Sequence, residues 1–233
     1  MALILNLETA TTVCSVSLAK DGKLLSLKEI NGDYSHAENL TVFIEDVLKQ
    51  ADININLLDA IAVSKGPGSY TGLRIGVSTA KGLCYSLDKP LIAINTLEQL
   101  SLSVLNNPKY QVQNSKSLFC PMLDARRMEV YCALFDNNNK CVMPTAALII
   151  DENSFADYLK ETSVFFFGDG AAKCKSALSG NKNAFFIDDI FPSAQNMISL
   201  SETAFNNNQF EDVAYFEPFY LKDFVAGKKK GEV

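Results

Sequence analysis

Residues 61–83 read IAVSKGPGSYTGLRIGVSTAKGL and carry the clearest local signal in the chain. The apolar run 61–63 predicts a buried strand, and the glycine-proline-glycine cluster 66–68 predicts a tight turn after it. A cap within residues 69–72 then begins a helix, because apolar residues follow at helical spacing. A strand, a glycine turn and a helix N-terminus direct backbone N–H groups toward one point, which favours an anion. The plainer alternative is that the glycines only allow strand and helix to pack closely.

The glycine spacing excludes two familiar phosphate loops. No Lys-Ser/Thr pair follows the last glycine as in a P-loop, and Gly66-x-Gly68-x-x-x-Gly72 is one residue too long for the dinucleotide fingerprint. Gly72, Gly76 and Ala80 also fall at i, i+4 and i+8, which leaves one stripe of the helix almost without side chains. An interior glycine costs about 1 kcal/mol against alanine, so we expect a close neighbour there, from the same chain or from a partner.

Composition places the chain among soluble intracellular proteins. Its 233 residues are 48% hydrophobic and 21% charged, as in ordinary globular domains. A formal net charge of −6 argues against a stand-alone nucleic-acid binder, and the Lys228–Lys230 run is interpreted as a solvated terminus. The six cysteines form no Cys-x-x-Cys pair, and neither a signal peptide nor an apolar run of transmembrane length is visible. We therefore predict a cytoplasmic location and no membrane contact.

The order of predicted elements indicates two related α/β halves. Strands at 3–7, 13–19 and 23–30 form a meander with a hydroxyl-rich first turn at 8–12 and an Asp21-Gly22 hairpin turn. A capping box at 35–38 begins an amphipathic helix. Further on we predict strands at 91–94, 118–123, 129–135, 146–150 and 164–167 and helices at 97–105, 154–160, 171–178 and after Ser193. The polar stretch 106–116 divides the chain into domains 1–105 and 106–233, with a last helix at about 213–233 that packs back on the first domain.

The residues themselves reveal no active site. His36 is the only histidine, so a two-histidine metal site is excluded, and we interpret it as a polar residue in the first turn of its helix. No nucleophile elbow or serine triad is present. Asp124-Ala-Arg126 at a predicted strand end suits either a salt bridge or a site for a phosphate or carboxylate.

Several motifs of the chain resemble those of one protein family. KGPGSYTGLRIG, at 65–76, resembles the signature of the TsaB (YeaZ) family of the actin-like (ASKHA, RNase H-like) superfold. The similarity covers nearly the whole chain and includes ILNLETAT at 4–11, the helix from His36, DARRMEVY at 124–131 and EPFYLK at 217–222. The resemblance implies two related actin-like halves, each a mixed sheet with a β-meander and flanking helices.

The resemblance also implies a partner rather than an enzyme. TsaB proteins support the threonylcarbamoyl transferase TsaD in making threonylcarbamoyladenosine next to the anticodon of tRNAs that read codons starting with A. TsaD binds its metal through a His-x-x-x-His pair, whose positions here are Thr96 and Leu100, which cannot ligate iron or zinc. We therefore expect no activity from this chain alone and no metal, as in an inactive relative of the M22 glycoproteases. Expected partners are TsaD, the small ATPase TsaE and a second copy of the chain, with tRNA contacted only indirectly.

Family members pair through two helices, and the resemblance implies which residues of this chain form the corresponding interface. The expected partner interface is His36, Leu40, Phe43, Ile44, Val47, Gly72, Gly76 and Ala80, shared by homodimer and heterodimer. Gly76→Leu should then abolish TsaD binding and leave the fold intact. A phosphate or nucleotide site is expected at Thr9, Thr11, Thr12, Gly66, Gly68, Ser69 and Thr71, with ATP or ADP at the TsaD interface as the candidate cofactor.

The chain departs from the family pattern at two points, and two other functions are considered. Glu8 occupies a position where the family usually has Asp, and the second half is shorter than in kinases of the superfold. The main alternative is a small kinase or ATPase that uses the threonines of the first turn and the glycine turn on phosphates. A peptidase, the label once attached to the superfamily, has little physical support with one histidine.

Overall fold

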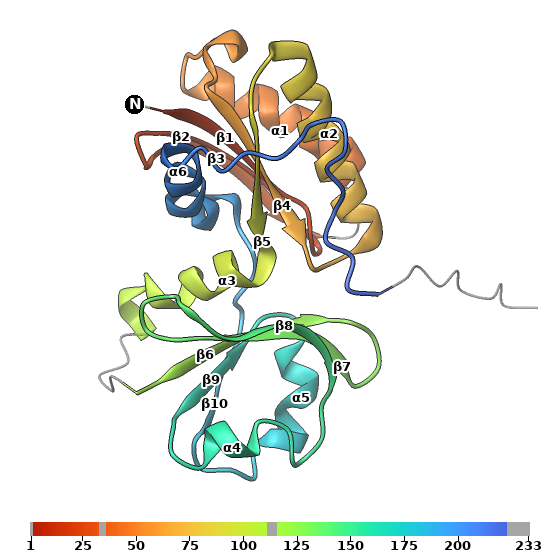
Figure 1. The fold of residues 1–233 in the computed structure, drawn as a ribbon, viewed down its shortest axis with the longest axis vertical. Coiled ribbons are helices and arrows are strands. Elements are labelled where there is room, and N and C mark those ends of the chain that lie inside the picture. The colour runs from red at the N-terminus through yellow and green to blue at the C-terminus, as the bar shows by residue number, and fades with distance from the viewer. Residues whose placement is uncertain (1, 33–35, 111–115, 223–233) are drawn as a thin grey trace, which may run out of the picture.

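The structure is a computed structural model that describes residues 2–32, 36–110 and 116–222. In these residues two five-stranded mixed sheets form two lobes, one above the other (Figure 1). The first sheet has the order β3-β2-β1-β4-β5, and the second has the equivalent order β8-β7-β6-β9-β10. In each, a three-strand antiparallel meander continues into two parallel strands. The predicted pair of related α/β halves, each with its meander, is confirmed.

The bounds of the strands follow the apolar runs of the sequence. The first sheet contains β1 (Leu3–Glu8), β2 (Val13–Lys20), β3 (Lys23–Asn31), β4 (Ala60–Gly66) and β5 (Leu91–Asn95). The second contains β6 (Leu118–Asp124), β7 (Glu129–Phe135), β8 (Cys141–Ile149), β9 (Val164–Phe167) and β10 (Ala184–Ile187). The predicted hairpin turn at Asp21 and Gly22 is present, and both residues have positive φ, the conformation that such a two-residue turn requires.

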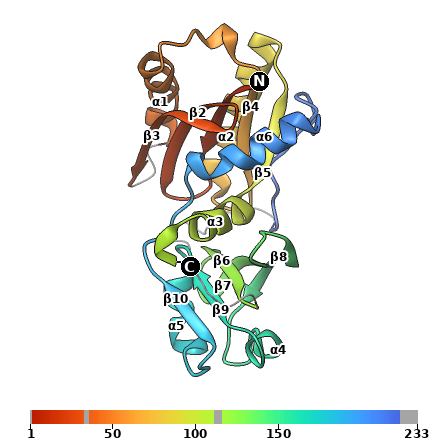
Figure 2. The same ribbon diagram turned by 90° about the vertical axis from the view of Figure 1, so that its left-hand side faces the viewer.

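Both faces of the first sheet are covered, because its strands are apolar on both sides. α1 (His36–Gln50) and α2 (Tyr70–Leu87) pack on the face that carries Leu3, Leu5 and Leu7 of β1, and η1 (Ile55–Leu57) follows α1. The alternate residue Ile4 faces η3 (Ala194–Met197) and α6 (Ile198–Asn206) on the opposite side. Figure 2 shows α6 lying across the first sheet on the side opposite α1 and α2.

The second sheet is enclosed in the same way. α4 (Ala156–Leu159) and α5 (Ala171–Leu178) cover one face. α3 (Thr96–Leu105) covers the other, where Leu97, Leu100 and Val104 pack with Phe119 and Phe167, and η2 (Pro108–Tyr110) follows it. α3 therefore lies at the junction of the lobes, directly after the last strand of the first sheet (Figure 1).

The structure corrects the expected division at residue 106. η3 and α6 belong to the first lobe, because their Ala194, Met197 and Ala204 complete its second core, so 106–233 is not one structural unit. Residues 213–222, expected to begin a last helix, contain no helix. Pro218 lacks an N–H donor, and the N–H of Phe219 donates to the Lys65 carbonyl oxygen instead of to its own turn (2.7 Å).

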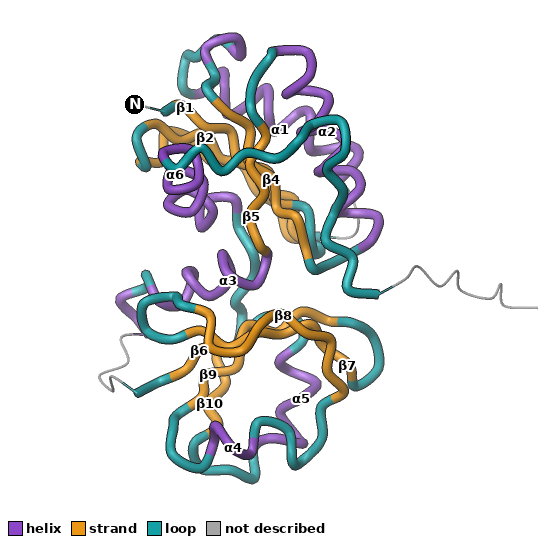
Figure 3. Tube along the Cα trace, in the orientation of Figure 1, coloured by secondary structure: helices purple, strands orange, loops and turns teal. Residues whose placement is uncertain are grey.

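Residues 207–222, called the C-terminal segment below, run as a loop along the first lobe to the junction (Figure 3). The rest of the predicted last helix, including Lys228–Lys230, and the predicted cap Ser35 lie outside the described residues. In the portion of the chain that the structure describes, no helix is long and apolar enough to cross a bilayer.

Candidate ligand site between the lobes

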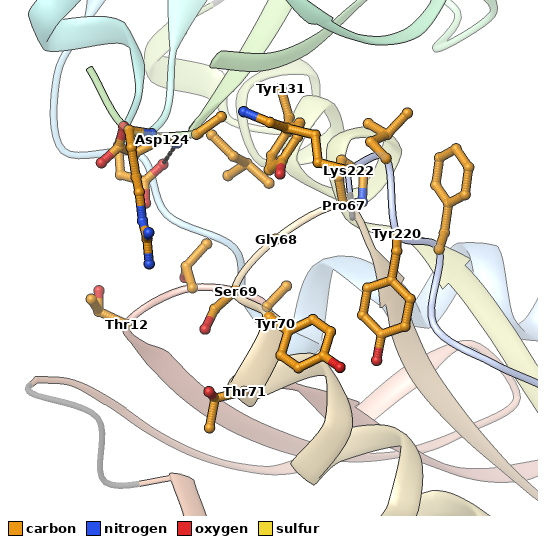
Figure 4. Close-up of a pocket in the computed structure, with 18 residues that line it drawn as sticks. Thr12, Pro67, Gly68, Ser69, Tyr70, Thr71, Asp124, Tyr131, Tyr220 and Lys222 are labelled. Atoms are coloured by element: carbon orange, nitrogen blue, oxygen red, sulfur yellow. Dashed lines mark hydrogen bonds between the residues drawn. The ribbon is translucent and has the colours of Figure 1, made fainter. Parts of the chain in front are cut away.

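A cavity of about 560 Å³ lies at the junction of the lobes (Figure 4). Three parts of the chain line it: the β1–β2 turn with the start of α2, the β6–β7 turn with the β9–α5 turn, and the end of the C-terminal segment. Its lining residues are Ala10, Thr11, Thr12, Pro67, Gly68, Ser69, Tyr70, Thr71, Leu123, Asp124, Ala125, Arg126, Tyr131, Asp169, Phe219, Tyr220, Leu221 and Lys222. The cavity therefore exists only when both lobes and the C-terminal segment are in place.

The first-lobe wall is built from hydroxyl groups and a helix N-terminus. Ser69 caps the 18-residue α2, because its Oγ accepts a hydrogen bond from the Gly72 N–H (3.3 Å). Its own N–H donates to the Ala10 carbonyl oxygen (2.7 Å), which fixes the glycine turn against the β1–β2 turn. The dipole of the helix start favours an anion at this wall.

Five of the seven predicted phosphate-site residues line the cavity, and two do not. Thr11, Thr12, Gly68, Ser69 and Thr71 are lining residues. Thr9 is fully buried, and its hydroxyl donates to the Gly72 carbonyl oxygen (2.8 Å). Gly66 is buried beneath the C-terminal segment, with a φ of 111° that favours glycine. Thr9 and Gly66 therefore do not line this cavity.

The glycines after the turn are explained by close packing within the chain. A Cβ at Gly68 would overlap the Ala10 carbonyl oxygen, one at Gly72 would overlap the Thr9 carbonyl oxygen, and one at Gly76 would overlap the Thr9 hydroxyl. These residues let α2 approach the β1–β2 turn to backbone distance. The plainer alternative from the sequence, close packing of strand and helix, thus accounts for all three positions.

The second-lobe wall contains a compact ionic cluster. The Asp124 N–H donates to Asp169 Oδ1 (3.0 Å), and Lys173 forms an ion pair with Asp124 and donates to the Glu129 carbonyl oxygen (2.7 Å). Burial raises the pKa of Asp169, and the neighbouring Asp124 carboxylate adds to the rise. Of the two sequence interpretations of Asp124-Ala-Arg126, the salt bridge applies to Asp124, whose partner is Lys173.

Arg126 remains as the cationic residue of that turn that lines the cavity. Arg126 and Arg127 both have positive φ, 72° and 50°, although neither is glycine. Such backbone conformations cost about 1–2 kcal/mol each, and they cluster at functional turns. The charged lining residues are nevertheless balanced, with Asp124 and Asp169 against Arg126 and Lys222. These four charges sum to zero, so the feature of the lining that favours an anion is the α2 N-terminus.

The C-terminal segment is the part of the site that the reasoning from residues missed. Phe219, Tyr220, Leu221 and Lys222 line the cavity, and the Tyr220 ring lies 5.0 Å from the Tyr70 ring, centroid to centroid. Lys222 forms an ion pair with Glu129 on the other lobe. The stretch 217–222 was noticed for its family resemblance, but no periodicity in it indicates which surface it covers.

Glu8 does not face the cavity. It is fully buried, and burial raises its pKa to about 7, opposed by the Ala10 N–H that donates to it. Gln99 of α3 donates its amide to the other carboxylate oxygen. Glu8 thus connects β1 to the helix between the lobes, and its extra methylene relative to Asp reaches Gln99 rather than a ligand.

The expected partner interface lies mostly inside the chain. Seven of its eight residues are buried, and Phe43 is half-buried. Leu40, Ile44, Val47 and Ala80 belong to the core between the helices and the first sheet. His36 is 2% exposed, and its Nε2 donates to the Thr11 carbonyl oxygen (2.7 Å). In this structure these residues are mostly covered by the chain itself: the α1 side chains pack on the first sheet, and Gly72 and Gly76 pack against Thr9 in the β1–β2 turn.

The transferase's histidine positions hold no ligating group. Thr96 is fully buried and its hydroxyl hydrogen-bonds to the Ser64 hydroxyl (2.8 Å), while Leu100 belongs to the core under α3. Among the residues that the structure describes, no group of three His, Cys, Asp or Glu side chains is placed to hold a metal ion.

Comparison with known proteins connects the chain to tRNA modification. The sequence model of the family described as TsaD, tRNA N6-adenosine threonylcarbamoyltransferase, matches residues 32–229. The chain is 26% identical over 231 residues to the "tRNA threonylcarbamoyladenosine biosynthesis protein TsaB" of Escherichia coli strain K12, with 97% of each chain covered. It is 30% identical over 230 residues to the protein of the same name from Bacillus subtilis strain 168, covering 94% of this chain and 93% of that one.

A solved structure shares the fold. "Crystal structure of an uncharacterized protein with similarity to peptidase YEAZ from Pseudomonas aeruginosa" superposes with a TM-score of 0.82 at 24% identity, covering 95% of this chain and 100% of that one. The likeness at this level of identity concerns the fold, and it includes both lobes.

Proposed function

The chain belongs to the TsaB family, and on this basis we propose that it is a non-catalytic partner of the transferase TsaD. In this role it is required, in the cytoplasm, to form threonylcarbamoyladenosine next to the anticodon of tRNAs that read codons starting with A. The observation that carries the proposal is the match over more than nine-tenths of both chains to relatives named for this modification. Thr96 and Leu100 occupy the positions expected to correspond to the transferase's two histidines, and they support a role without metal chemistry because neither side chain has the imidazole nitrogen of a histidine ligand.

The partner surface consists of the outward faces of α1 and α2 rather than of the glycine stripe. Val42 on α1 is 50% exposed, Tyr85 on α2 is 87% exposed, and Phe43 is half-buried and packs against the core. Aromatic and aliphatic residues of this kind form the centres of protein interfaces. TsaD and a second copy of this chain compete for this surface in our proposal. TsaE joins the assembly with TsaD, and tRNA is contacted through the partners.

Measurement of the modified nucleoside tests the proposal. Total tRNA is isolated after depletion of this protein in its own organism, digested, and analysed by mass spectrometry for threonylcarbamoyladenosine. We expect the modification to collapse and to return when an intact gene is supplied on a plasmid. An unchanged level in depleted cells would contradict the proposal.

A second candidate function is suggested by the cavity. Its first-lobe wall combines the α2 N-terminus with the hydroxyl groups of Thr11, Ser69 and Thr71, which suits the phosphates of ATP or ADP. If the chain is instead a small ATPase or kinase acting alone, the purified protein hydrolyses ATP. Thr11→Ala then lowers the rate, whereas Thr203→Ala, at an exposed threonine of α6, does not. Absence of turnover by the intact chain removes this alternative.

A further inference from the structure

The C-terminal segment is anchored to the first lobe before it reaches the cavity. The Glu211 N–H donates to the Leu91 carbonyl oxygen (2.9 Å), and Lys81 of α2 donates to the carbonyl oxygens of Ala214 (3.2 Å) and Phe216 (2.9 Å). Val213 and Phe216 pack against the core of that lobe. The segment up to Phe216 is therefore a fixed part of the first lobe.

Residues 219–222 are called the strap here, and they begin on the glycine turn. The Phe219 N–H donates to the Lys65 carbonyl oxygen (2.7 Å), and the Phe219 carbonyl oxygen lies 2.9 Å from the place where a Cβ at Gly66 would stand. Any side chain at Gly66 would push the strap away. The first glycine of the sequence motif thus serves the seating of the strap, and not ligand contact.

The strap then crosses from one lobe to the other. Tyr220 packs on Tyr70 at the start of α2, while Lys222 pairs with Glu129 on β7 of the second lobe. All four strap residues line the cavity, and Figure 4 shows Tyr70 beside Tyr220 on one side and Lys222 near Tyr131 on the other. The strap is consequently a wall of the cavity and a connection between the lobes at once.

Two of the connections between the lobes differ in character. On the α3 side, buried contacts join the helix to both lobes: Gln99 donates to the Glu8 carboxylate of the first lobe, and Leu100 packs in a hydrophobic core with the second sheet. On the strap side, the contact with the second lobe is an ion pair whose side chains remain 41% and 24% exposed, for Lys222 and Glu129 respectively. Exposed ion pairs are weak and are screened by water and salt, whereas a packed core resists opening.

We propose that the strap is a reversible latch: release of Lys222 from Glu129 and of Tyr220 from Tyr70 opens the cavity, and α3, which has buried contacts with both lobes, acts as the hinge. Entry of a ligand larger than the present cavity requires this release. The latch is a property of the chain itself and does not depend on which partner or ligand the protein serves.

A probe cysteine in the cavity wall tests the latch. Ala125 lines the cavity and is only 8% exposed, so Ala125→Cys reports opening through its rate of alkylation by N-ethylmaleimide, followed by mass spectrometry. Cys141→Ser removes the exposed native thiol, and the other five cysteines are buried. In this background we expect Lys222→Glu to raise the alkylation rate at residue 125 about two- to fivefold, the shift expected for loss of one exposed ion pair.

Three further variants make the test specific. The double variant Lys222→Glu with Glu129→Lys restores the pair with its charges exchanged, and the rate should return to the starting value. Tyr220→Ala should raise the rate independently. Lys160→Glu breaks a comparable exposed ion pair, with Asp157, away from the cavity and should leave the rate unchanged. An unaltered rate in Lys222→Glu and Tyr220→Ala, no recovery in the exchanged pair, or an equal rise in Lys160→Glu would overturn the latch.

Discussion

Two glycines of α2 differ in how much space surrounds them, and this difference determines whether a larger residue is tolerated at each position. A Cβ at Gly76 would overlap the Thr9 hydroxyl, whereas a Cβ at Gly82 would meet no atom within 4 Å. The same substitution in the same helix should therefore have opposite effects on stability. This pair also separates a packing role of the glycine motif from a partner-binding role.

Gly76→Leu should destabilise the fold, and Gly82→Leu should not. Overpacking against Thr9 in the β1–β2 turn predicts a loss of about 1–3 kcal/mol in the free energy of unfolding for Gly76→Leu. The helix propensity of leucine is more favourable than that of glycine by about 0.7 kcal/mol, so Gly82→Leu should leave the free energy of unfolding unchanged or raise it. Urea unfolding followed by circular dichroism measures both. Equal stability of the two variants would show that the stripe is not packed on Thr9, and the earlier expectation of an intact Gly76→Leu fold would stand.

Glu8 is a second residue whose environment determines its behaviour. Burial raises its pKa to about 7, so in the folded protein it holds its proton at pH values where it is ionised in the unfolded chain. Its contribution to stability is fully present below pH 4.5, the ordinary value, and is lost as the pH rises through about 7. The neutral acid suits its buried position between β1 and α3.

The stability of the Glu8→Gln variant relative to the unaltered protein should therefore increase as the pH rises. Glutamine keeps the shape and carries no charge, so the difference in unfolding free energy between variant and parent should shift toward the variant by about 2–3 kcal/mol between pH 5 and pH 8. Urea titrations at both values measure it. Parallel pH profiles for variant and parent would mean that Glu8 is ionised in the folded protein.

At the scale of elements, α1 and α2 each use one face for the core and leave the other to solvent. The apolar face of α1, predicted from the periodicity, packs on the first sheet, and the small-residue stripe of α2 does the same. What remains for a partner is the outward surface with Val42 and Tyr85. The helices proposed for docking are unchanged, but the residues that can make contact are different ones.

Val42→Asp should weaken TsaD binding without unfolding the chain. A carboxylate on the outward face of α1 would be desolvated at an apolar interface, and we expect at least about a tenfold loss of affinity by analogy with interface hot spots. Ile149→Asp is the matched control, because Ile149 is 75% exposed on β8 of the other lobe. Calorimetric titration with purified TsaD measures both. Similar affinities for the two variants would place the partner surface elsewhere.

The individual elements were largely predictable from local patterns. The predicted strands overlap β1 to β9, and the helices predicted after residues 70, 96, 171 and 193 are present. The helix expected at 213–233 is absent from the described residues 213–222. There the Phe219 N–H donates to the Lys65 carbonyl oxygen, and the carbonyl oxygens of Ala214 and Phe216 accept from the Lys81 side chain. Where an element pairs with a distant strand or turn, its periodicity carries little information.

At the scale of the whole molecule, the two lobes depend on one another through chain segments that cross between them. The second face of the first sheet is covered by η3 and α6, which follow the entire second lobe in sequence. Ser17 Oγ donates to the Ala194 carbonyl oxygen (2.9 Å), and the Ala194 N–H donates to Ser15 Oγ (2.9 Å), which fixes η3 against β2. The first 105 residues alone lack this cover.

A fragment of residues 1–105 should therefore not fold cooperatively. Without η3 and α6, the face of the first sheet that carries Ala2, Ile4, Ile92 and Ile94 is exposed, and α3 has no second sheet to cover. We expect the fragment to bind the dye ANS and to lack a sharp thermal transition, while the full chain shows one. Cooperative melting of the fragment would restore the domain boundary first drawn at residue 106.

The sequence by itself determined most of the elements, the pairing of two related α/β lobes and the family, because these follow from local periodicity, turn chemistry and a long motif. The tertiary structure alone decided what the motif is for. Gly68, Gly72 and Gly76 allow the β1–β2 turn to pack against the chain at backbone distance, and Gly66 does the same for the strap. Five of the seven predicted phosphate-site residues line the cavity. The physical reason is distance along the chain, because the segments that pack on the motif lie about 60 residues before it and about 150 after it. Only folding brings their backbone atoms against glycines that have no side chain in the way.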